Sequence, residues 1–300
     1  MEDNKIFGRG ANDMKGGIAA IIHALKAIQE AGIILKGDVT VESVPDEEQT
    51  SMGTLSCCQR GYTADAAIIP EPTNMKVLVA VRGSVYGKIT VLGRAGHAEM
   101  PQPDWTEGGA VNAISKAAKV IVALDELNDE WKMSPEKQHK YLDPDIITPT
   151  VIHGGEWPVT VPEKVEITFG SMFIPSTKDK IKEIEAKLKS VADSDSWLKE
   201  HPPKLETEGW QYGAEVKENE PIVDTGKEAL RDLGIEPELR GYGSLTDAIH
   251  LINHMGIPTI SIGPDINTAH MADEYVDIDE LMNTTKAMAL CIMRWCGTGT

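Results

Sequence analysis

The chain has 300 residues, of which 41% are hydrophobic and 25% are charged, and this composition is typical of a globular protein with a large core or two domains. Its net charge of −18 argues against binding to a nucleic-acid backbone or an anionic membrane surface. No apolar run approaches the length of a membrane span.

The first and last parts of the chain alternate between predicted helices and strands. Residues 16–31 carry apolar side chains at helical spacing and predict a helix that stops at Gly32. Residues 38–44 are rich in β-forming residues and alternate between apolar and polar side chains, which predicts a strand. The short apolar runs 64–70 and 257–263 predict buried strands. These parts are expected to form one α/β domain.

The middle of the chain follows a different order. Its predicted elements run strand, helix, strand, strand, helix, strand, which matches a ferredoxin-like α+β unit. The domains expected from this change are 1–82 and 213–300 as two parts of one α/β domain, with 83–212 inserted between them. The elements of the insert are strands at 85–92, 148–153, 164–174 and 204–212, and helices at 107–127 and 177–200.

Acidic side chains and one histidine follow the predicted strands of the outer parts. Asp13 lies in a glycine-rich turn before the first helix, Glu47 and Glu48 follow the first strand, Glu71 follows the second, and His270 follows the last. In open α/β sheets, ligands bind outside the carboxyl ends of the strands. Carboxylate oxygens with an imidazole suit zinc or a similar divalent ion, and an open coordination position would make the site catalytic.

Each of these residues has a simpler interpretation when it is taken alone. Asp13 can be a helix N-cap, the Glu47–Glu48 pair can be solvated surface, Glu71 can merely end a strand, and His270 can be a surface histidine. Only their joint arrangement favours a metal site over these alternatives.

Four segments in this order resemble motifs of the M20 metallopeptidase family, which includes acetylornithine deacetylase, succinyl-diaminopimelate desuccinylase, aminoacylase-1 and carboxypeptidase G2. They are GRGANDMKGG, PDEE, PEPT and AHMADEYV, and Glu47 lies 34 residues after Asp13, as in the family. The segment GRAGHAEMPQ at 93–102 is similar to the start of the family's lid and dimerisation domain. The resemblance implies a mixed-sheet α/β metallohydrolase with an inserted ferredoxin-like lid.

The resemblance also implies roles for individual residues. Two metal ions, usually zinc with cobalt or manganese as alternatives, would be bridged by Asp13. Glu48 and His270 would complete one site and Glu71 would serve the other, while Glu47 would act as the general base. His97, from the lid of a partner in a homodimer, would help to hold the oxyanion.

The first departure from the family concerns its early His-x-Asp motif, whose histidine is the remaining ligand of the second metal. The corresponding position would fall before Met1. We therefore expect at most one metal in this chain, and we treat the catalytic domain as truncated at its N-terminus. An inactive fragment or a non-catalytic dimeric relative stays open as an alternative.

The second departure concerns substrate binding. Val159 and Phe173 stand where carboxylate-binding members of the family have Asn and Arg, and an apolar side chain cannot replace the bidentate contact of Arg. The segment GGEWP is similar to that of formylaminopyrimidine deformylases within the acetylornithine-deacetylase-like proteins. Arg240, Gly243 and Ser244 are further candidates for substrate binding, with Arg82 as another possible anion ligand.

The predicted activity is therefore a metal-dependent hydrolysis of the amide in a small N-acyl or N-formyl compound, by a deacylase or deformylase. A dipeptidase or carboxypeptidase of the same family is the alternative enzyme. The four cysteines, at 57, 58, 291 and 296, lack zinc-ribbon spacing and are too few for a disulfide framework. With no recognisable signal peptide at the start, these features predict a cytoplasmic protein.

Overall fold

The computed structural model describes residues 3–299, which divide into two compact units. The first unit comprises the described residues up to Val81 together with those from Ala214 onwards, and the second is Arg82–Gly213. No helix among the described residues is long and apolar enough to cross a membrane.

The first unit is a mixed α/β structure. A sheet runs in the order β10-β3-β12-β2 with β11 also paired to β3, and β1 pairs separately with β13. Its elements are β1 (Lys5–Phe7), α1 (Lys15–Glu30), α2 (Met52–Gln59), β2 (Ala67–Ile69), β3 (Val77–Val81), β10 (Ala214–Glu215), α6 (Pro221–Asp232), β11 (Leu239–Tyr242), α7 (Ala248–Met255), β12 (Thr259–Ser261), β13 (Tyr275–Asp277) and α8 (Ile278–Cys296).

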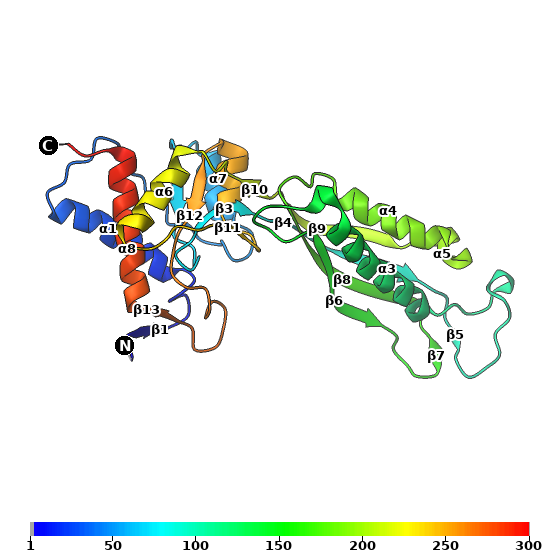
Figure 1. Ribbon diagram of the computed structural model, residues 1–300. Helices are drawn as coiled ribbons and strands as arrows, with labels where there is room; N and C mark the ends of the chain where they lie inside the picture. Colours follow the sequence, from blue (N-terminus) through cyan, green and yellow to red (C-terminus); the bar gives the residue numbers. More distant parts are fainter. Residues whose placement is uncertain (1–2, 300) are drawn as a thin grey trace. The chain divides into compact units, whose positions relative to one another are not determined.

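Helix α1 confirms the helix predicted near the start of the chain. Its buried side is made of small residues followed by Ile28, and it packs against α8 (Figure 1). The predicted strands at 64–70 and 257–263 also form, as β2 and β12, and they pair in parallel. Strand β12 is buried and contacts α6 and α7, whereas β2 lies at the end of the sheet and only its Ile69 is buried.

The second unit has the ferredoxin-like order expected from the sequence. Its sheet runs β6-β8-β4-β9 with every pairing antiparallel, so the first strand in the chain lies between the third and the fourth. Its elements are β4 (Gly83–Leu92), β5 (Gly96–His97), η1 (Trp105–Glu107), α3 (Ala113–Met133), η2 (Pro135–Lys137), β6 (Ile146–Gly154), β7 (Thr160–Val161), β8 (Lys164–Phe173), α4 (Lys180–Asp193), α5 (Ser196–Glu200) and β9 (Lys204–Gln211).

The core of the second unit lies between this sheet and its helices. Alternate residues of β8 are buried, as the two-residue period of a strand requires when one face is covered. Helices α3 and α4 cover that face (Figure 1). Strand residues such as Ile89, Ile167 and Phe169 pack there against Leu124 and Leu188 of the helices.

Three predicted elements differ in the structure. Residues 38–44 do not form a strand, because they are largely exposed and no described strand pairs with them. The helix predicted at 107–127 begins later, since Gly108 has a positive φ of 92° and the Asn112 side chain caps α3 at Ile114 N.

The third difference lies at 177–200, where one long helix was predicted. Two helices form there instead, because Asp195 leaves the helical conformation and its carboxylate caps the following helix at Trp197 N and Leu198 N. Lys116 and Lys119 of α3 contact the same carboxylate, so a tertiary contact stabilises this break.

Candidate metal centre

Asp13, Glu48 and His270 converge in the first unit. One ligand atom from each of them lies within 4.8 Å of the others. The Nε2 atom of His270 is 2.9 Å from Oε2 of Glu48 and 3.3 Å from Oδ2 of Asp13. Glu48 and His270 are exposed, so a small molecule can reach the cluster from solvent.

Three separate segments bring these side chains together. Asp13 lies in the turn that precedes α1, Glu48 in the loop before α2, and His270 in the loop between β12 and β13. Strand β1 pairs antiparallel with β13, and this pairing lays the Asp13 turn beside the His270 loop. The approach is tertiary, because Asp13 and His270 stand at opposite ends of the chain.

Two further acidic side chains lie near the cluster, and burial together with the charges around them raises their pKa values. Burial, followed by the nearby Asp247 and Glu48 carboxylates, raises the pKa of Glu47 to about 7. Glu71 is only 3% exposed, and burial followed by Glu47 and Asp13 raises its pKa well above the usual value. Oxygen and imidazole donors around uncompensated negative charge fit a divalent cation, whose charge offsets the repulsion among them.

Close backbone packing positions Glu71. A Cβ atom on Gly17 of α1 would lie 2.4 Å from the carbonyl oxygen of Pro70, and a Cβ on Gly263 would lie 2.1 Å from that of Glu71. Only glycine permits both approaches. Helix α1 and the end of β12 therefore hold the segment that follows β2 from two sides.

Two residues that the sequence did not single out also lie near the cluster. Burial, followed by the charges of Glu71 and Asp13, raises the pKa of Tyr242. Asp247 is buried at the start of α7 and accepts a hydrogen bond from Thr54 Oγ1 at 2.7 Å. Both belong to the segment GYGSLTDA, in which the glycine-rich pattern predicted binding roles only for Gly243 and Ser244.

His97 and Val159 lie together within the second unit. Strand β5, which carries His97, pairs with β7, and Ala98 N donates to the carbonyl of Val159 at 2.8 Å. The His97 side chain is exposed, and its Nδ1 accepts from Glu99 N at 3.3 Å. The two residues therefore share one end of the second unit.

The structure contradicts the expectation that Phe173 faces a substrate. Its side chain has no exposed surface, and its ring lies 5.3 Å from that of Trp210. A ring in the core cannot line an open pocket. Arg82 is also used internally, because its guanidinium donates to the carbonyls of Asp143 and Pro144.

The remaining substrate-binding candidates lie on β11 and after it. Arg240 is half exposed, and its Nε contacts Oε1 of Glu238 at 2.6 Å, so a neighbouring carboxylate already pairs with it. Gly243 and Ser244 lie exposed in the turn between β11 and α7. The structure gives no contact between these three residues and the Asp13–Glu48–His270 cluster among the described residues.

Comparison with known sequences identifies relatives along nearly the whole chain. The model of the peptidase family M20/M25/M40 matches residues 1–294. The N-formyl-4-amino-5-aminomethyl-2-methylpyrimidine deformylase of Bacillus subtilis is 32% identical, over 97% of this chain and 72% of that protein. The succinyl-diaminopimelate desuccinylase of Nitrosospira multiformis is 29% identical, over 93% of this chain and 72% of that protein.

Solved structures share the fold. A tripeptidase from Staphylococcus aureus superposes with a TM-score of 0.77 at 22% identity, over 97% of this chain and 74% of that one. Aminopeptidase PepT from Bacillus cereus gives a TM-score of 0.75 at 22% identity, with the same coverage. The mixed-sheet α/β fold with its inserted α+β unit is thus confirmed.

Proposed function

The chain belongs to peptidase family M20/M25/M40 and is a metal-dependent amidohydrolase, and on this premise we propose that it removes a formyl or other small acyl group from an amine on a heterocycle. The observation that carries the proposal is the convergence of Asp13, Glu48 and His270 with Glu47 beside them. This set provides metal ligands and a separate proton acceptor in one solvent-accessible place.

Asp13, Glu48 and His270 would hold the metal, which we propose to be zinc. Carboxylate and imidazole are ligands that zinc uses at catalytic sites, where three protein ligands leave one position open. When bound, such an ion polarises the amide carbonyl and makes a water molecule more acidic. Glu71 is proposed as a candidate ligand of a second, weakly held ion, because its buried carboxyl group is close enough to Glu47 and Asp13 for their charges to raise its pKa, and at most one tightly bound ion per chain is expected.

Glu47 would move the proton. Its carboxylate would accept a proton from the attacking water and later donate that proton to the leaving amine. The environment supports this assignment, because burial and neighbouring acids bring the pKa of Glu47 to about 7. Glu47 and Glu48 are adjacent in the turn at 47–50, and Oε2 of Glu48 contacts Nε2 of His270 at 2.9 Å, so Glu48 is assigned to the metal and Glu47 to the proton. His97 from the second unit of the other copy in the proposed homodimer is proposed to help hold the oxyanion.

Substrate preference rests on Val159 and on the relatives. Val159 cannot pair with an α-carboxylate, and a carboxylate buried without a partner costs several kcal/mol. The relatives that are 31–32% identical are deformylases of an aminopyrimidine, whose substrate carries no carboxylate at the amine. Phe173 no longer contributes to this argument, because it lies in the core.

The test is the ratio of kcat/KM for an N-formyl aminopyrimidine to that for N-acetylornithine, with N-succinyl-diaminopimelate as a third substrate. We expect the formyl compound to be preferred by about tenfold or more, since each buried unpaired charge weakens binding by at least that factor. A ratio well below one would instead indicate a carboxylate-binding deacylase and would direct attention to Arg240.

The second unit is proposed to act as the lid and to form a homodimer. Strand β6 lies at the edge of its sheet and exposes Val151 and Ile152, and α3 exposes Ile114 and Val122. An exposed apolar edge strand is a site for pairing with a second copy.

We expect light scattering to give the mass of two chains, and we expect Ile152→Lys to shift the measured mass toward that of one chain. Ile22→Lys, at an exposed isoleucine of α1, is the matched control and should leave the mass unchanged. A monomeric wild-type protein at micromolar concentration would contradict this assignment.

A further inference from the structure

A buried carboxylate lies beneath the turn that carries Asp13. Glu274 is only 3% exposed, and its Oε1 accepts hydrogen bonds from Asn12 N and Asp13 N, each at 3.0 Å. Its Oε2 accepts from Gly10 N at 3.0 Å and from Nη1 of Arg9 at 2.8 Å. Both oxygens of Glu274 are thus occupied by donors from one short turn.

These bonds determine the conformation of the turn. Residues 10–13 precede α1, so their backbone N–H groups have no partner inside a helix. Hydrogen bonds to an ionised acceptor are shorter and roughly twice as strong as neutral ones. One of the three backbone donors belongs to Asp13 itself, so the contact holds the residue whose side chain reaches His270.

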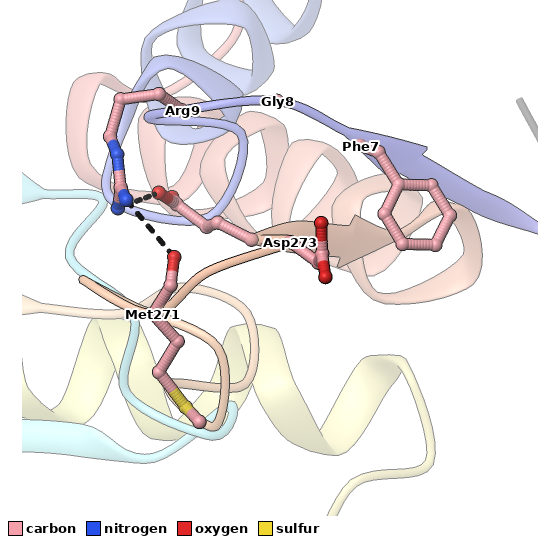
Figure 2. A pocket seen from close by; sticks show the side chains of 6 residues that line it. Phe7, Gly8, Arg9, Met271 and Asp273 are labelled. Atoms are coloured by element: carbon pink, nitrogen blue, oxygen red, sulfur yellow. Dashed lines mark hydrogen bonds and ion pairs between the residues drawn. The ribbon is translucent and has the colours of Figure 1, made fainter.

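The same carboxylate belongs to the loop that carries His270. Glu274 follows His270 by four residues, and its backbone carbonyl accepts from Gly8 N at 2.9 Å. Arg9 lines a surface pocket and contacts the Glu274 carboxylate, and its guanidinium also donates to the carbonyl of Met271 at 3.0 Å (Figure 2). The turn and the loop are therefore joined at several points between residues 8–13 and residues 271–274, next to the Asp13–His270 contact.

We propose that Glu274 is a positioning residue, which fixes the Asp13 carboxylate relative to the His270 imidazole and thereby sets the affinity of the site for its metal. The proposal rests on the function proposed above. Glu274 is not itself a ligand in this arrangement, because four donors occupy its two oxygens. Groups that orient metal ligands typically change metal affinity about 10–100-fold when they are removed.

A purely structural role would have a different consequence. Asp277 provides the comparison, because its carboxylate caps α8 by accepting from Asp279 N at 2.9 Å and from Glu280 N at 3.4 Å. It lies three residues after Glu274, and its carboxylate also accepts from Asn4 Nδ2 at 3.4 Å, but it accepts from no residue of the Asp13 turn in the described hydrogen bonds. Loss of this cap should lower stability without disturbing the geometry of Asp13 and His270.

The experiment measures zinc affinity by competition with a chromophoric chelator, together with the urea midpoint of each variant. We expect Glu274→Ala to weaken zinc binding about 10–100-fold. Glu274→Gln should bind more tightly than Glu274→Ala but more weakly than the wild type, because its amide oxygen can still accept from Asn12 and Asp13 while its NH₂ faces Gly10 N and Arg9. Asp277→Ala should lower the urea midpoint and keep wild-type zinc affinity.

Unchanged zinc affinity in folded Glu274→Ala would overturn this inference while leaving the proposed function intact. An equal loss of affinity in Asp277→Ala would also overturn it, since the effect would then follow stability alone. If Glu274→Ala does not fold, the zinc affinity of Glu274→Gln tests the proposal instead. A wild-type zinc affinity in that variant would reject the proposal. A wild-type chain that binds no zinc would reject the proposed metal centre itself, and this inference with it.

Discussion

Replacement of Glu47 by alanine is expected to abolish amide hydrolysis while leaving the metal content of the protein nearly unchanged. Glu47 is assigned to the proton and not to the metal, and a positioned general base typically contributes about 10²–10⁴ to the rate. Turnover of an N-formyl aminopyrimidine and zinc content by elemental analysis, both on the same preparation, provide the two measurements.

Glu48→Ala is the matched variant, because it removes the same group from the adjacent residue. Glu48 contacts Nε2 of His270 at 2.9 Å and is assigned as a metal ligand, so this variant should lose metal as well as activity. Equal metal loss in both variants would show that the division of roles between Glu47 and Glu48 is wrong. Retention of metal in both would remove Glu48 from the ligand set.

The second large effect is expected on stability, at the buried ion pair between Asp145 and Lys180. Both side chains are fully buried, with Nζ of Lys180 2.8 Å from Oδ2 of Asp145 and 3.1 Å from the centre of the Trp131 ring. Asp145 also accepts from Ile174 N and Thr177 Oγ1. Asp145→Ala should lower the free energy of unfolding of the second unit by about 3–5 kcal/mol, because it leaves a buried ammonium without its partner.

Urea denaturation followed by tryptophan fluorescence measures this loss. Lys189→Ala is the control on the same helix, since it breaks an exposed pair with Asp193 and should cost less than about 1 kcal/mol. Asp145→Leu combined with Lys180→Met should recover much of the loss, because apolar replacement of both partners leaves no unpaired charge. A loss below about 1 kcal/mol for Asp145→Ala would show that water or Glu183, whose Oε2 lies 3.9 Å from Nζ, compensates the Lys180 ammonium.

The same pair predicts a pH dependence. Burial acts to raise the pKa of Asp145, but the Lys180 ammonium and its hydrogen bonds outweigh it, so the pKa lies below its usual value. A carboxyl group whose pKa is lower in the folded state stabilises the fold above its unfolded pKa of about 3.9, and this contribution is lost as the pH falls through the folded value. The stability difference between wild type and Asp145→Asn should therefore shrink below about pH 4. A difference that stays constant down to pH 2 would contradict this assignment.

The sequence by itself determined the elements whose residues carry a clear period. Helix α1 and the strands of the second unit follow from apolar spacing, because a buried face must recur at 3.6 or at 2 residues. The order of these elements along the chain was enough to predict the ferredoxin-like unit. The family motifs named Asp13, Glu48 and His270, which the fold then brought within 4.8 Å.

The elements that the sequence misplaced depend on contacts between distant residues. Residues 38–44 have a strand pattern but no described neighbour to pair with, and a strand requires such a neighbour for its hydrogen bonds. The long helix at 177–200 is broken because Asp195 is held by two lysines of α3. The periodicity within a segment does not show whether a neighbouring strand is present to pair with it, or whether lysines of another helix will hold one of its residues.

Only the tertiary structure decided which side chains face the site. The resemblance to the family predicted that Phe173 stands in place of a substrate-binding arginine, yet the packing of the second unit buries it beside Trp210. Glu274 lies in the segment AHMADEYV, but its role depends on backbone donors more than 260 residues away in the chain. A side chain's type is written in the sequence, whereas its partners are determined by the path of the backbone, which brings β1 beside β13 and the Asp13 turn beside the His270 loop.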